Sequence, residues 1–373
     1  MKIAFCIFNY FPFGGLQRDF IKIISAILRR GHTIDIYTMS WQGDHLDGTT
    51  IIEVPIHAWT NHRKARLFAQ HIEQIKSAGQ YDVVVGFNKM PGLDVCFVGD
   101  VCLKERLDKK SFFYRLFPRY RCYLQLERAV FAPEAGTSIL LLTEQQRETY
   151  KRHYQTPSNR FYLLPAGIAK NHLSADEMQA IKRGIRQSLG FLSDDPKMLL
   201  FVATHFHTKG LDRAIRAIAT IKQDVVLCVI GENSRKKDYV KLAERLNVDH
   251  RMRWLGNCPG VFNYFIASDL LIHPARVEAA GMVLIEALTA GLPVLTTAVC
   301  GYASHIRAAQ AGVVLAEPFN QSYLNDTLQH LLDHQNDWMI WRENALNYAQ
   351  KTDFYSLADR AAMLIVERGE RHG

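Results

Sequence analysis

The residues best suited to chemistry lie in one segment, Glu278 to Glu286, in which two carboxylates flank Gly281. We predict that Glu278 ends a polar loop, that Gly281 opens a helix, and that Glu286 lies about a turn and a half inside it. A helix N-terminus attracts phosphate groups, and carboxylates accept hydrogen bonds from hydroxyls. The segment therefore predicts a nucleotide-sugar site, with Glu286 on the ribose and Glu278 on the transferred sugar. The backbone expected to bind the donor diphosphate is that of Ala280, Gly281, Met282 and Val283.

A lysine before another expected helix offers a cation for the same diphosphate. Lys209 lies between an expected strand at 198–203 and an expected helix at 210–222. An ammonium group there would neutralise the charge that grows as the nucleotide leaves. The alternative is a solvated lysine at a helix start, which the helix dipole disfavours. For Glu286, the alternative of a solvated surface carboxylate is likewise disfavoured, because that residue lies in an otherwise apolar stretch.

Glycines and carboxylates also follow expected strands in the first half. Gly14 and Gly15 come after strand 2–8 and allow a ligand to approach the backbone closely, although a tight turn explains them equally well. Asp19 either bonds a sugar hydroxyl or complements the helix dipole. Asp100, after strand 95–98, either bonds the transferred sugar or caps the next segment. Asp19, Asp100, Lys209 and Glu278 are therefore the candidate catalytic residues.

The most cationic tract, residues 103–131, interleaves basic and aromatic side chains. Eight Lys/Arg against three Asp/Glu give 8 − 3 = +5, and an apolar stripe from Phe113 to Leu124 recurs at helical spacing. Pro118 is expected to split the stretch or to start a helix. Such a segment suits an anionic membrane surface or an anionic acceptor; the alternative is a core stripe with solvated arginines. The cations expected at the acceptor or membrane are Lys104, Arg106, Lys109, Lys110, Arg115, Arg119 and Arg121.

Length and composition indicate a globular chain of two mid-sized domains. The chain has 373 residues, 48% apolar and 22% charged. No run of about eighteen uncharged apolar residues exists, so no membrane span is expected. Seven cysteines without a C-x-x-C pair indicate neither a disulfide framework nor a zinc site. Residues 1–165 hold 22 Lys/Arg and 15 Asp/Glu, so they carry +7 of the net +8. An anionic partner is expected, but no nucleic-acid motif is found.

Alternating strands and helices predict an α/β fold with a parallel sheet in each half. The expected domains are residues 1–166 and 167–354, divided at Leu164-Pro165-Ala166-Gly167. We expect their strand ends to line a cleft, as in a pair of Rossmann-like domains. Strands are expected near 2–8, 33–38, 51–56, 82–85, 95–98, 138–142, 198–203, 225–230, 251–254, 269–272, 292–296 and 312–315. Helices are expected near 16–30, 62–78, 112–131, 143–153, 210–222, 236–246, 281–290, 320–334, 338–350 and 355–368.

Several motifs resemble the retaining GT-B glycosyltransferases of the GT4 family. The stretch from Ser268 to Gly301 is similar to the broad family. Tyr10 to Phe20, Gly86 to Asp94, Tyr114-Arg115-Leu116 and Leu295 to Ala303 resemble its lipopolysaccharide core heptose α-1,3-glucosyltransferases, and this resemblance covers essentially the whole chain. The resemblance implies two facing Rossmann-like domains, the first for acceptor and the second for donor. It also implies that a terminal helix, about 355–373, crosses back to the first domain.

The same resemblance implies transfer of glucose from UDP-glucose to a heptose of the lipopolysaccharide inner core, with retention. The enzyme would be cytoplasmic and peripheral on the inner membrane, with the basic first half toward that anionic surface. No two acidic residues are spaced as in the D-x-D metal clamp, so no obligatory metal is expected. Retention without an evident carboxylate nucleophile favours front-face displacement, with the leaving phosphate oxygen taking the acceptor proton.

The chain also departs from the family pattern. Thr208 stands where close relatives carry arginine beside the lysine, and the early arginine of the loop is missing. His172 or His207 would then be the substitute cation, with His172 counted among the donor-binding residues. Other donors, namely UDP-galactose, UDP-N-acetylglucosamine or a GDP-sugar, stay open. A UDP-sugar 2-epimerase and a non-catalytic membrane-surface protein are the alternatives from other classes.

Overall fold

The chain forms two units, each built on a parallel β-sheet. A computed structural model describes residues 1–12, 14–171, 173–191 and 196–371. Unit 1 comprises Met1–Gly167 and Tyr355–Gly373, and unit 2 comprises Ile168–Phe354. The predicted fold class of two parallel-sheet, Rossmann-like halves is confirmed.

Unit 1 contains a seven-stranded sheet in the order β3-β2-β1-β4-β5-β6-β7. Its central strands are nearly continuous runs of buried apolar residues, as expected of parallel strands covered on both faces. The strands are β1 (Lys2–Cys6), β2 (Thr33–Thr38), β3 (Thr49–Glu53), β4 (Val83–Gly86), β5 (Val95–Val98), β6 (Ser138–Leu141) and β7 (Phe161–Leu163). The helices are α1 (Gly15–Leu28), α2 (Asn61–Ser77), α3 (Leu103–Asp108), α4 (Pro118–Phe131), α5 (Glu144–Tyr154) and α15 (Leu357–Glu370), with 3₁₀ turns at Phe112–Leu116 and Ser158–Arg160.

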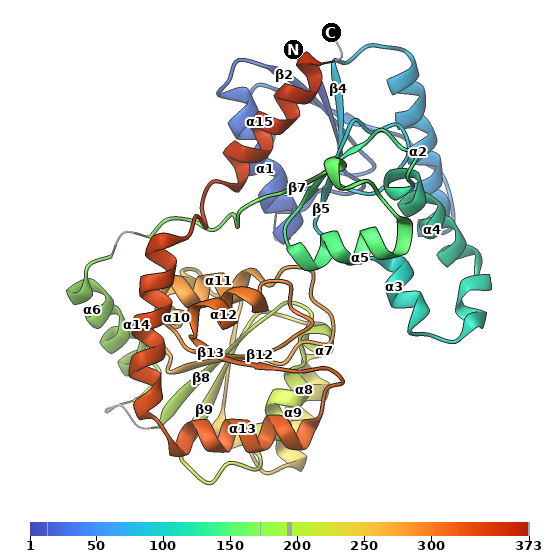
Figure 1. The fold of residues 1–373 in the computed structure, drawn as a ribbon. Coiled ribbons are helices and arrows are strands. Elements are labelled where there is room, and N and C mark those ends of the chain that lie inside the picture. The colour runs from blue at the N-terminus through green and yellow to red at the C-terminus, as the bar shows by residue number, and fades with distance from the viewer. Residues whose placement is uncertain (13, 172, 192–195, 372–373) are drawn as a thin grey trace. The chain divides into compact units, whose positions relative to one another are not determined.

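The last helix of the chain belongs to unit 1. In Figure 1, α15 in red lies beside α1 in blue, and the two helices are in contact. Asp359 of α15 forms an ion pair with Arg30 at 3.3 Å. Gly369 lies close to β4, because a Cβ built on this glycine would be 2.6 Å from the Val83 side chain. The tail of the chain thus completes the cover of the first sheet.

Unit 2 contains a six-stranded sheet in the order β10-β9-β8-β11-β12-β13, with helices around it (Figure 1). Its strands are β8 (Lys197–Val202), β9 (Val225–Ile230), β10 (Met252–Gly256), β11 (Leu270–His273), β12 (Val294–Thr297) and β13 (Gly312–Leu315). Its helices are α6 (Ala175–Ser188), α7 (Phe206–Lys209), α8 (Leu211–Ile218), α9 (Lys236–Arg245), α10 (Val261–Ala267), α11 (Met282–Thr289), α12 (Ala303–Ala309), α13 (Gln321–Asp333) and α14 (Asn336–Lys351), with a 3₁₀ turn at Asp249–Arg251.

The expected helix at 112–131 is wrong in its first part. The segment forms a 3₁₀ turn at Phe112–Leu116, and α4 starts only at Pro118, its first residue. Proline has no N–H and forces the residue before it out of the helical region, and Phe117 is accordingly extended with ψ 132. The core alternative is wrong for the first part of the stripe, since Phe113 is 71% exposed and Leu116 and Phe117 are also exposed, whereas Tyr120 and Leu124 are half-buried.

The expected helix at 210–222 corresponds to the shorter α8, and the short helix α7 precedes it. Helix α7 ends at Lys209, and Gly210, which adopts a left-handed conformation with φ +82, is the N-cap residue of α8. Lys209 therefore lies between β8 and α8, as expected, and it is also the last residue of α7. Strand β7 and helices α3, α10 and α12 were not predicted, because they are short. Helix α6, which has 14 residues, was also not predicted.

Candidate active site

The site in unit 2 lies where its strand order reverses direction. Strand β8 is hydrogen-bonded to β9 on one side and to β11 on the other, so the chain switches direction between β8 and β11. Ligands of open parallel sheets bind at such a switch point, beyond the carboxyl ends of the strands. Lys209 comes shortly after β8, and Glu278 comes after β11. The topology therefore brings together two residues that lie far apart in the sequence.

A close backbone contact holds the two segments together. A Cβ at Gly210 would lie 2.0 Å from the carbonyl oxygen of Pro274, so no larger residue fits there. Arg213 Nη1 donates to the carbonyl oxygens of Pro274 and Ala275, both at 3.1 Å. These contacts fix the loop after β11 against the start of α8.

An ion pair strengthens the same junction. Arg276 forms two parallel bonds with the carboxylate of Asp212, each 2.7 Å long. Its backbone N–H also donates to the carbonyl oxygen of Thr208 at 2.8 Å. Paired guanidinium–carboxylate bonds of this kind add geometric precision as well as energy. The sequence alone could not identify Arg213, Asp212 and Arg276, because their role depends on contacts between segments about sixty residues apart.

Lys209, Glu278 and His273 form the charged centre of the site. Lys209 Nζ donates to Glu278 Oε2 at 2.5 Å, and His273 Nε2 lies 3.5 Å from the same oxygen. Burial alone would raise the pKa of Glu278, but His273 and Lys209 outweigh it and lower that pKa to about 2. The carboxylate is therefore ionised. Both contacts are made to Oε2 and not to the second oxygen, Oε1.

His273 is the unpredicted member of this centre. It ends β11 and is only 1% exposed. Burial alone would lower its pKa, but the neighbouring Cys300 and Glu278 outweigh burial and raise that pKa to about 9. A lone histidine at the end of an apolar strand gave no indication in the sequence of this contact.

The start of α11 completes the donor side. Gly281 is the N-cap residue and has a left-handed backbone, with φ +92. Ala280 is buried, and its carbonyl oxygen accepts a hydrogen bond from the Tyr302 N–H at 2.8 Å. The first amide groups of a helix, here at Met282 and Val283, have no intrahelical partner. Glu286, one turn further, is half-buried.

In unit 1, Gly14, Gly15 and Asp19 lie at the start of α1. Gly14 is the N-cap residue, and a Cβ there would collide with the Gln17 side chain, whereas a Cβ at Gly15 would meet open space. Asp19 is 4% exposed, and its Oδ1 has no hydrogen-bond partner among the described residues. Burial raises its pKa to about 6, against the opposing charges of Arg18 and Lys22. A buried carboxylate oxygen without a partner is available to a ligand hydroxyl.

Asp100 does not cap the helix that follows it. Its side chain is 71% exposed and pairs with Lys89 Nζ at 2.9 Å. The start of α3 is capped instead by Glu127 of α4, which accepts hydrogen bonds from the backbone N–H groups of Leu103 and Lys104 at 2.8 and 3.0 Å. The helix-cap alternative for Asp100 is therefore wrong, because a carboxylate distant in sequence occupies that position.

Glu127 is the anchor of a buried polar network. It is 1% exposed, and it binds Lys89 Nζ at 2.8 Å and the hydroxyl group of Tyr154 at 2.7 Å. Burial alone would raise its pKa, but Lys89 and these hydrogen bonds lower it. In the sequence, Glu127 is only one of the charges of the cationic tract, and its burial is visible only in the structure.

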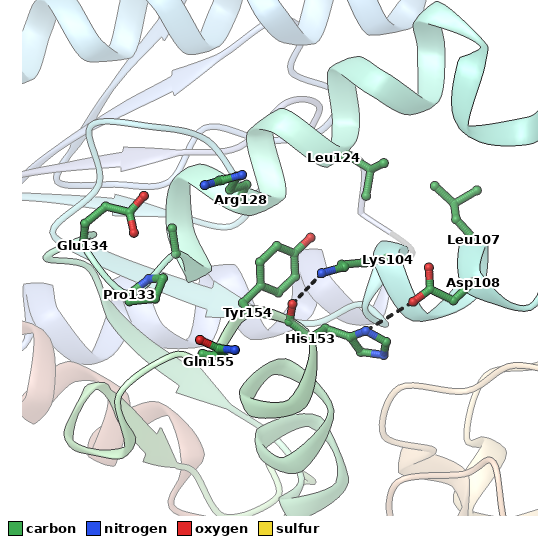
Figure 2. Close-up of a pocket in the computed structure, with 11 residues that line it drawn as sticks. Lys104, Leu107, Asp108, Leu124, Arg128, Pro133, Glu134, His153, Tyr154 and Gln155 are labelled. Atoms are coloured by element: carbon green, nitrogen blue, oxygen red, sulfur yellow. Dashed lines mark hydrogen bonds and ion pairs between the residues drawn. The ribbon is translucent and has the colours of Figure 1, made fainter. Parts of the chain in front are cut away.

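The predicted cations of residues 103–131 have different environments. Lys104 is partly buried and donates to the carbonyl oxygen of His153 at 2.6 Å (Figure 2). Lys109 pairs with Glu105 at 3.3 Å, and Lys110 lies over the Tyr114 ring. The side chains of Arg106, Arg119 and Arg121 are exposed. The side chain of Arg115 and the whole of His172 lie outside the described residues.

A metal site and a membrane-spanning helix are both missing from the described residues. No group of three or more His, Cys, Asp or Glu side chains within these ranges is placed to hold a metal ion. None of the described helices has the length and apolar character needed to cross a membrane.

Two parallel-sheet units, with a lysine–carboxylate pair beside a helix N-terminus at a switch point, are the arrangement of a GT-B glycosyltransferase. Residues 184–348 match the family model described as glycosyl transferases group 1. The chain is 43% identical over 370 residues to lipopolysaccharide glucosyltransferase WaaG of Escherichia coli (strain K12), covering 98% of each chain. The chain belongs to this family of glycosyltransferases, and the resemblance noted in the sequence is confirmed.

Solved structures agree with this assignment. A crystal structure of WaaG, described as a glycosyltransferase involved in lipopolysaccharide biosynthesis, matches with a TM-score of 0.89 at 43% identity, covering 97% of this chain and 99% of that one. The Anabaena protein HepE, solved with UDP and glucose, matches with a TM-score of 0.72 at 18% identity over 100% of both chains. At that identity the second match shows the fold alone.

Proposed function

We propose that the chain transfers glucose from UDP-glucose to a heptose of the lipopolysaccharide inner core, forming an α-1,3 link without an obligatory metal. The observation that carries the proposal is the 43% identity, over 98% of both chains, to a protein named lipopolysaccharide glucosyltransferase. The charged centre of unit 2 supports the chemistry, because it offers a cation for phosphate and a carboxylate for sugar hydroxyls.

In this proposal unit 2 binds the donor. Lys209 and the first amide groups of α11, at Met282 and Val283, bind the diphosphate. Glu278 contacts Lys209 and His273 through Oε2, which leaves Oε1 for a hydroxyl of the transferred sugar. Glu286 binds the ribose hydroxyls. The protein thereby stabilises the charge that develops on the leaving diphosphate.

Transfer proceeds by front-face displacement. The bond between the anomeric carbon and the diphosphate oxygen breaks, and the acceptor oxygen bonds to that carbon on the same face. The acceptor proton moves to the departing phosphate oxygen, and Lys209 neutralises the remaining charge. A trapped glycosyl-enzyme on Asp19, Asp100 or Glu278 would contradict this course.

Unit 1 binds the acceptor in this proposal, and it rests on the cytoplasmic face of the inner membrane. Exposed Phe113, Leu116 and Phe117 lie within the same tract as exposed arginines. Apolar side chains beside cations suit an anionic lipid surface. Binding to anionic vesicles tests this part.

One incubation tests the reaction. Purified protein is supplied with UDP-glucose and heptose-terminated lipopolysaccharide, with and without a chelator, and the product mass and anomeric configuration are measured. We expect one added hexose in α configuration in both conditions. Transfer only from UDP-galactose, UDP-N-acetylglucosamine or a GDP-sugar would refute the donor. Turnover of an N-acetylated donor without any acceptor would indicate a 2-epimerase, and loss of activity with chelator would refute metal independence.

A further inference from the structure

A pocket of about 370 Å³ lies at the switch point of the unit 1 sheet. The strand order reverses between β1 and β4, and Phe8 and Asn88, which follow these strands, both line the pocket. Asn88 Oδ1 accepts a hydrogen bond from the Phe8 N–H at 2.7 Å, which ties the two loops together. Open parallel sheets bind ligands at this position, so the pocket has the location of a substrate site.

Three cations line the pocket and are not neutralised there. Among the described residues no carboxylate pairs with the guanidinium group of Arg106 or Arg119, and Lys110 contacts only the Tyr114 ring, 4.8 Å from its centroid. The pocket also contains two carboxylates, Asp100 and Glu127. Both bind Lys89, at 2.9 and 2.8 Å. The lining therefore presents an excess of positive charge to a ligand.

Aromatic side chains and one hydrogen-bond acceptor complete the lining. Tyr120 and Tyr123 of α4 are half-buried there. Asp100 is exposed and held by Lys89, which is itself held by buried Glu127. Such a combination of aromatic faces with a few fixed polar groups is typical of sites for small polar ligands.

We propose that this pocket binds an anionic group, a phosphate or a carboxylate, on the acceptor glycan. Arg106 and Arg119 contact the anion, and Asp100 accepts a hydrogen bond from a neighbouring sugar hydroxyl. This inference rests on the proposed function and deepens it, because it assigns the acceptor's charge to a particular pocket instead of a general basic surface.

The pocket next to it does not share these properties. A cavity of about 510 Å³ lies beside Leu107, which lines both pockets (Figure 2). Its lining balances two cations, Lys104 and Arg128, with two carboxylates, Asp108 and Glu134. Lys104 donates to the His153 carbonyl oxygen, and the His153 ring lies 3.4 Å from Asp108. That cavity therefore has no comparable excess of positive charge.

The tract contains a matched control for the experiment. Lys109 and Arg121 are exposed and belong to the same tract as Arg106 and Arg119, but they do not line the pocket. A double change at either pair removes two positive charges. A lipid surface or a long-range field would respond to both pairs alike, whereas a built site responds only to its lining residues.

The test measures binding of deacylated, heptose-terminated core oligosaccharide by calorimetry, without vesicles. Arg106→Gln with Arg119→Gln is compared with Lys109→Gln with Arg121→Gln, after thermal melts confirm that both variants are folded. We expect the first pair to raise Kd roughly 10-fold or more, because charge-assisted bonds are lost, and the control pair to change it less than about twofold. Dephosphorylated and carboxyl-reduced oligosaccharides identify the anion. The oligosaccharide that lacks the bound group should bind weakly, and the two double variants should then bind it with equal affinity.

Several results would overturn the proposal: equal weakening by both pairs, an effect that appears only with anionic vesicles, undiminished binding of both anion-stripped oligosaccharides, or no binding at all. Kinetics separate this inference from the proposed function. If glucose transfer occurs and both pairs leave the acceptor KM unchanged, the pocket assignment fails alone. If the oligosaccharide binds as expected and no nucleotide sugar is consumed, the proposed function fails and the pocket stands.

Discussion

At the scale of single residues, the centre of unit 2 is a carboxylate shared between two cations. Glu278 is 14% exposed and contacts Lys209 and His273 through one oxygen. Removal of one member of a buried charged group costs more than the pair contributes, because the remaining charge loses its partner. Each of the three side chains should therefore have a measurable and distinct effect.

Lys209→Ala should lower kcat for sugar transfer about 10²- to 10³-fold, the loss typical when a group that stabilises developing charge is removed. Steady-state kinetics with saturating donor and acceptor measure this. Lys237→Ala, an exposed lysine of α9, is the control and should leave kcat unchanged. A Lys209→Ala enzyme with normal kcat would remove this lysine from the mechanism.

His273 should make stability depend on pH at the alkaline side. Its pKa is raised from 6.5 to about 9, so its stabilising contribution is complete below pH 6.5 and is lost as the pH rises through 9. The Tm advantage of wild type over His273→Gln should therefore shrink between pH 6.5 and 9. Thermal melts across this range measure the advantage. A difference that stays constant across that range would contradict the charged state of His273.

At the scale of elements, the site depends on how loops are tied to neighbouring helices. Gly210 allows close contact between the α7–α8 junction and the backbone of Pro274, and Glu127 joins α4 to the start of α3. Glu127 lies inside α4, whereas Gly210 lies at the junction of α7 and α8, and each tie joins segments that are distant in the sequence. Both place a charged side chain, Lys209 in one case and Lys89 in the other, next to its carboxylate.

Gly210→Ala should destabilise unit 2 and weaken UDP binding, because the new Cβ would lie 2.0 Å from a carbonyl oxygen and φ is +82. We expect a loss of about 2 kcal/mol or more in the free energy of unfolding. Gly184→Ala in α6 is the matched control: its Cβ meets open space, and alanine there should add about 0.5–1 kcal/mol. Urea titrations measure both, and equal effects would refute the close-contact argument.

Glu127→Ala should cost about 3–5 kcal/mol of unfolding free energy, because it leaves buried Lys89 with only the exposed carboxylate of Asp100. Glu127→Leu combined with Lys89→Met should cost less, since no charge is then stranded. Glu105→Ala breaks only the ion pair with the largely exposed Lys109 and should change stability by about 0–1 kcal/mol. Chemical denaturation distinguishes these cases, and a double variant less stable than the single one would reverse the interpretation.

At the scale of the whole molecule, charge is divided unequally along the chain. Residues 1–165 carry 22 − 15 = +7, whereas residues 166–373 carry 23 − 22 = +1. Phe113 and Phe117, both exposed, lie within the basic tract of the first part. A surface of this kind is suited to an anionic membrane, at about 1 kcal/mol per basic residue close to the lipid.

Binding to vesicles that contain anionic lipid should therefore be strong at low salt and weaken as ionic strength rises. Phe113→Ser with Phe117→Ser should reduce the bound fraction in a flotation assay, because less apolar surface enters the interface. Met339→Ser with Ile340→Ser, exposed apolar residues of α14, is the control and should have little effect. Equal binding to neutral and anionic vesicles would exclude the electrostatic part of the proposal.

The sequence predicts most of the order of strands and helices, because apolar periodicity and glycine turns are local properties. The family could also be recognised from its sequence motifs. The positions of Lys209 after one strand and Glu278 after another could be predicted in the same way. Their contact could not: it joins residues 69 apart and depends on β8 lying next to β11. Burial of Glu127 and His273 likewise depends on which segments pack around them. Tertiary packing, through strand order and desolvation, decided which of the visible charges are paired and which are left for a ligand.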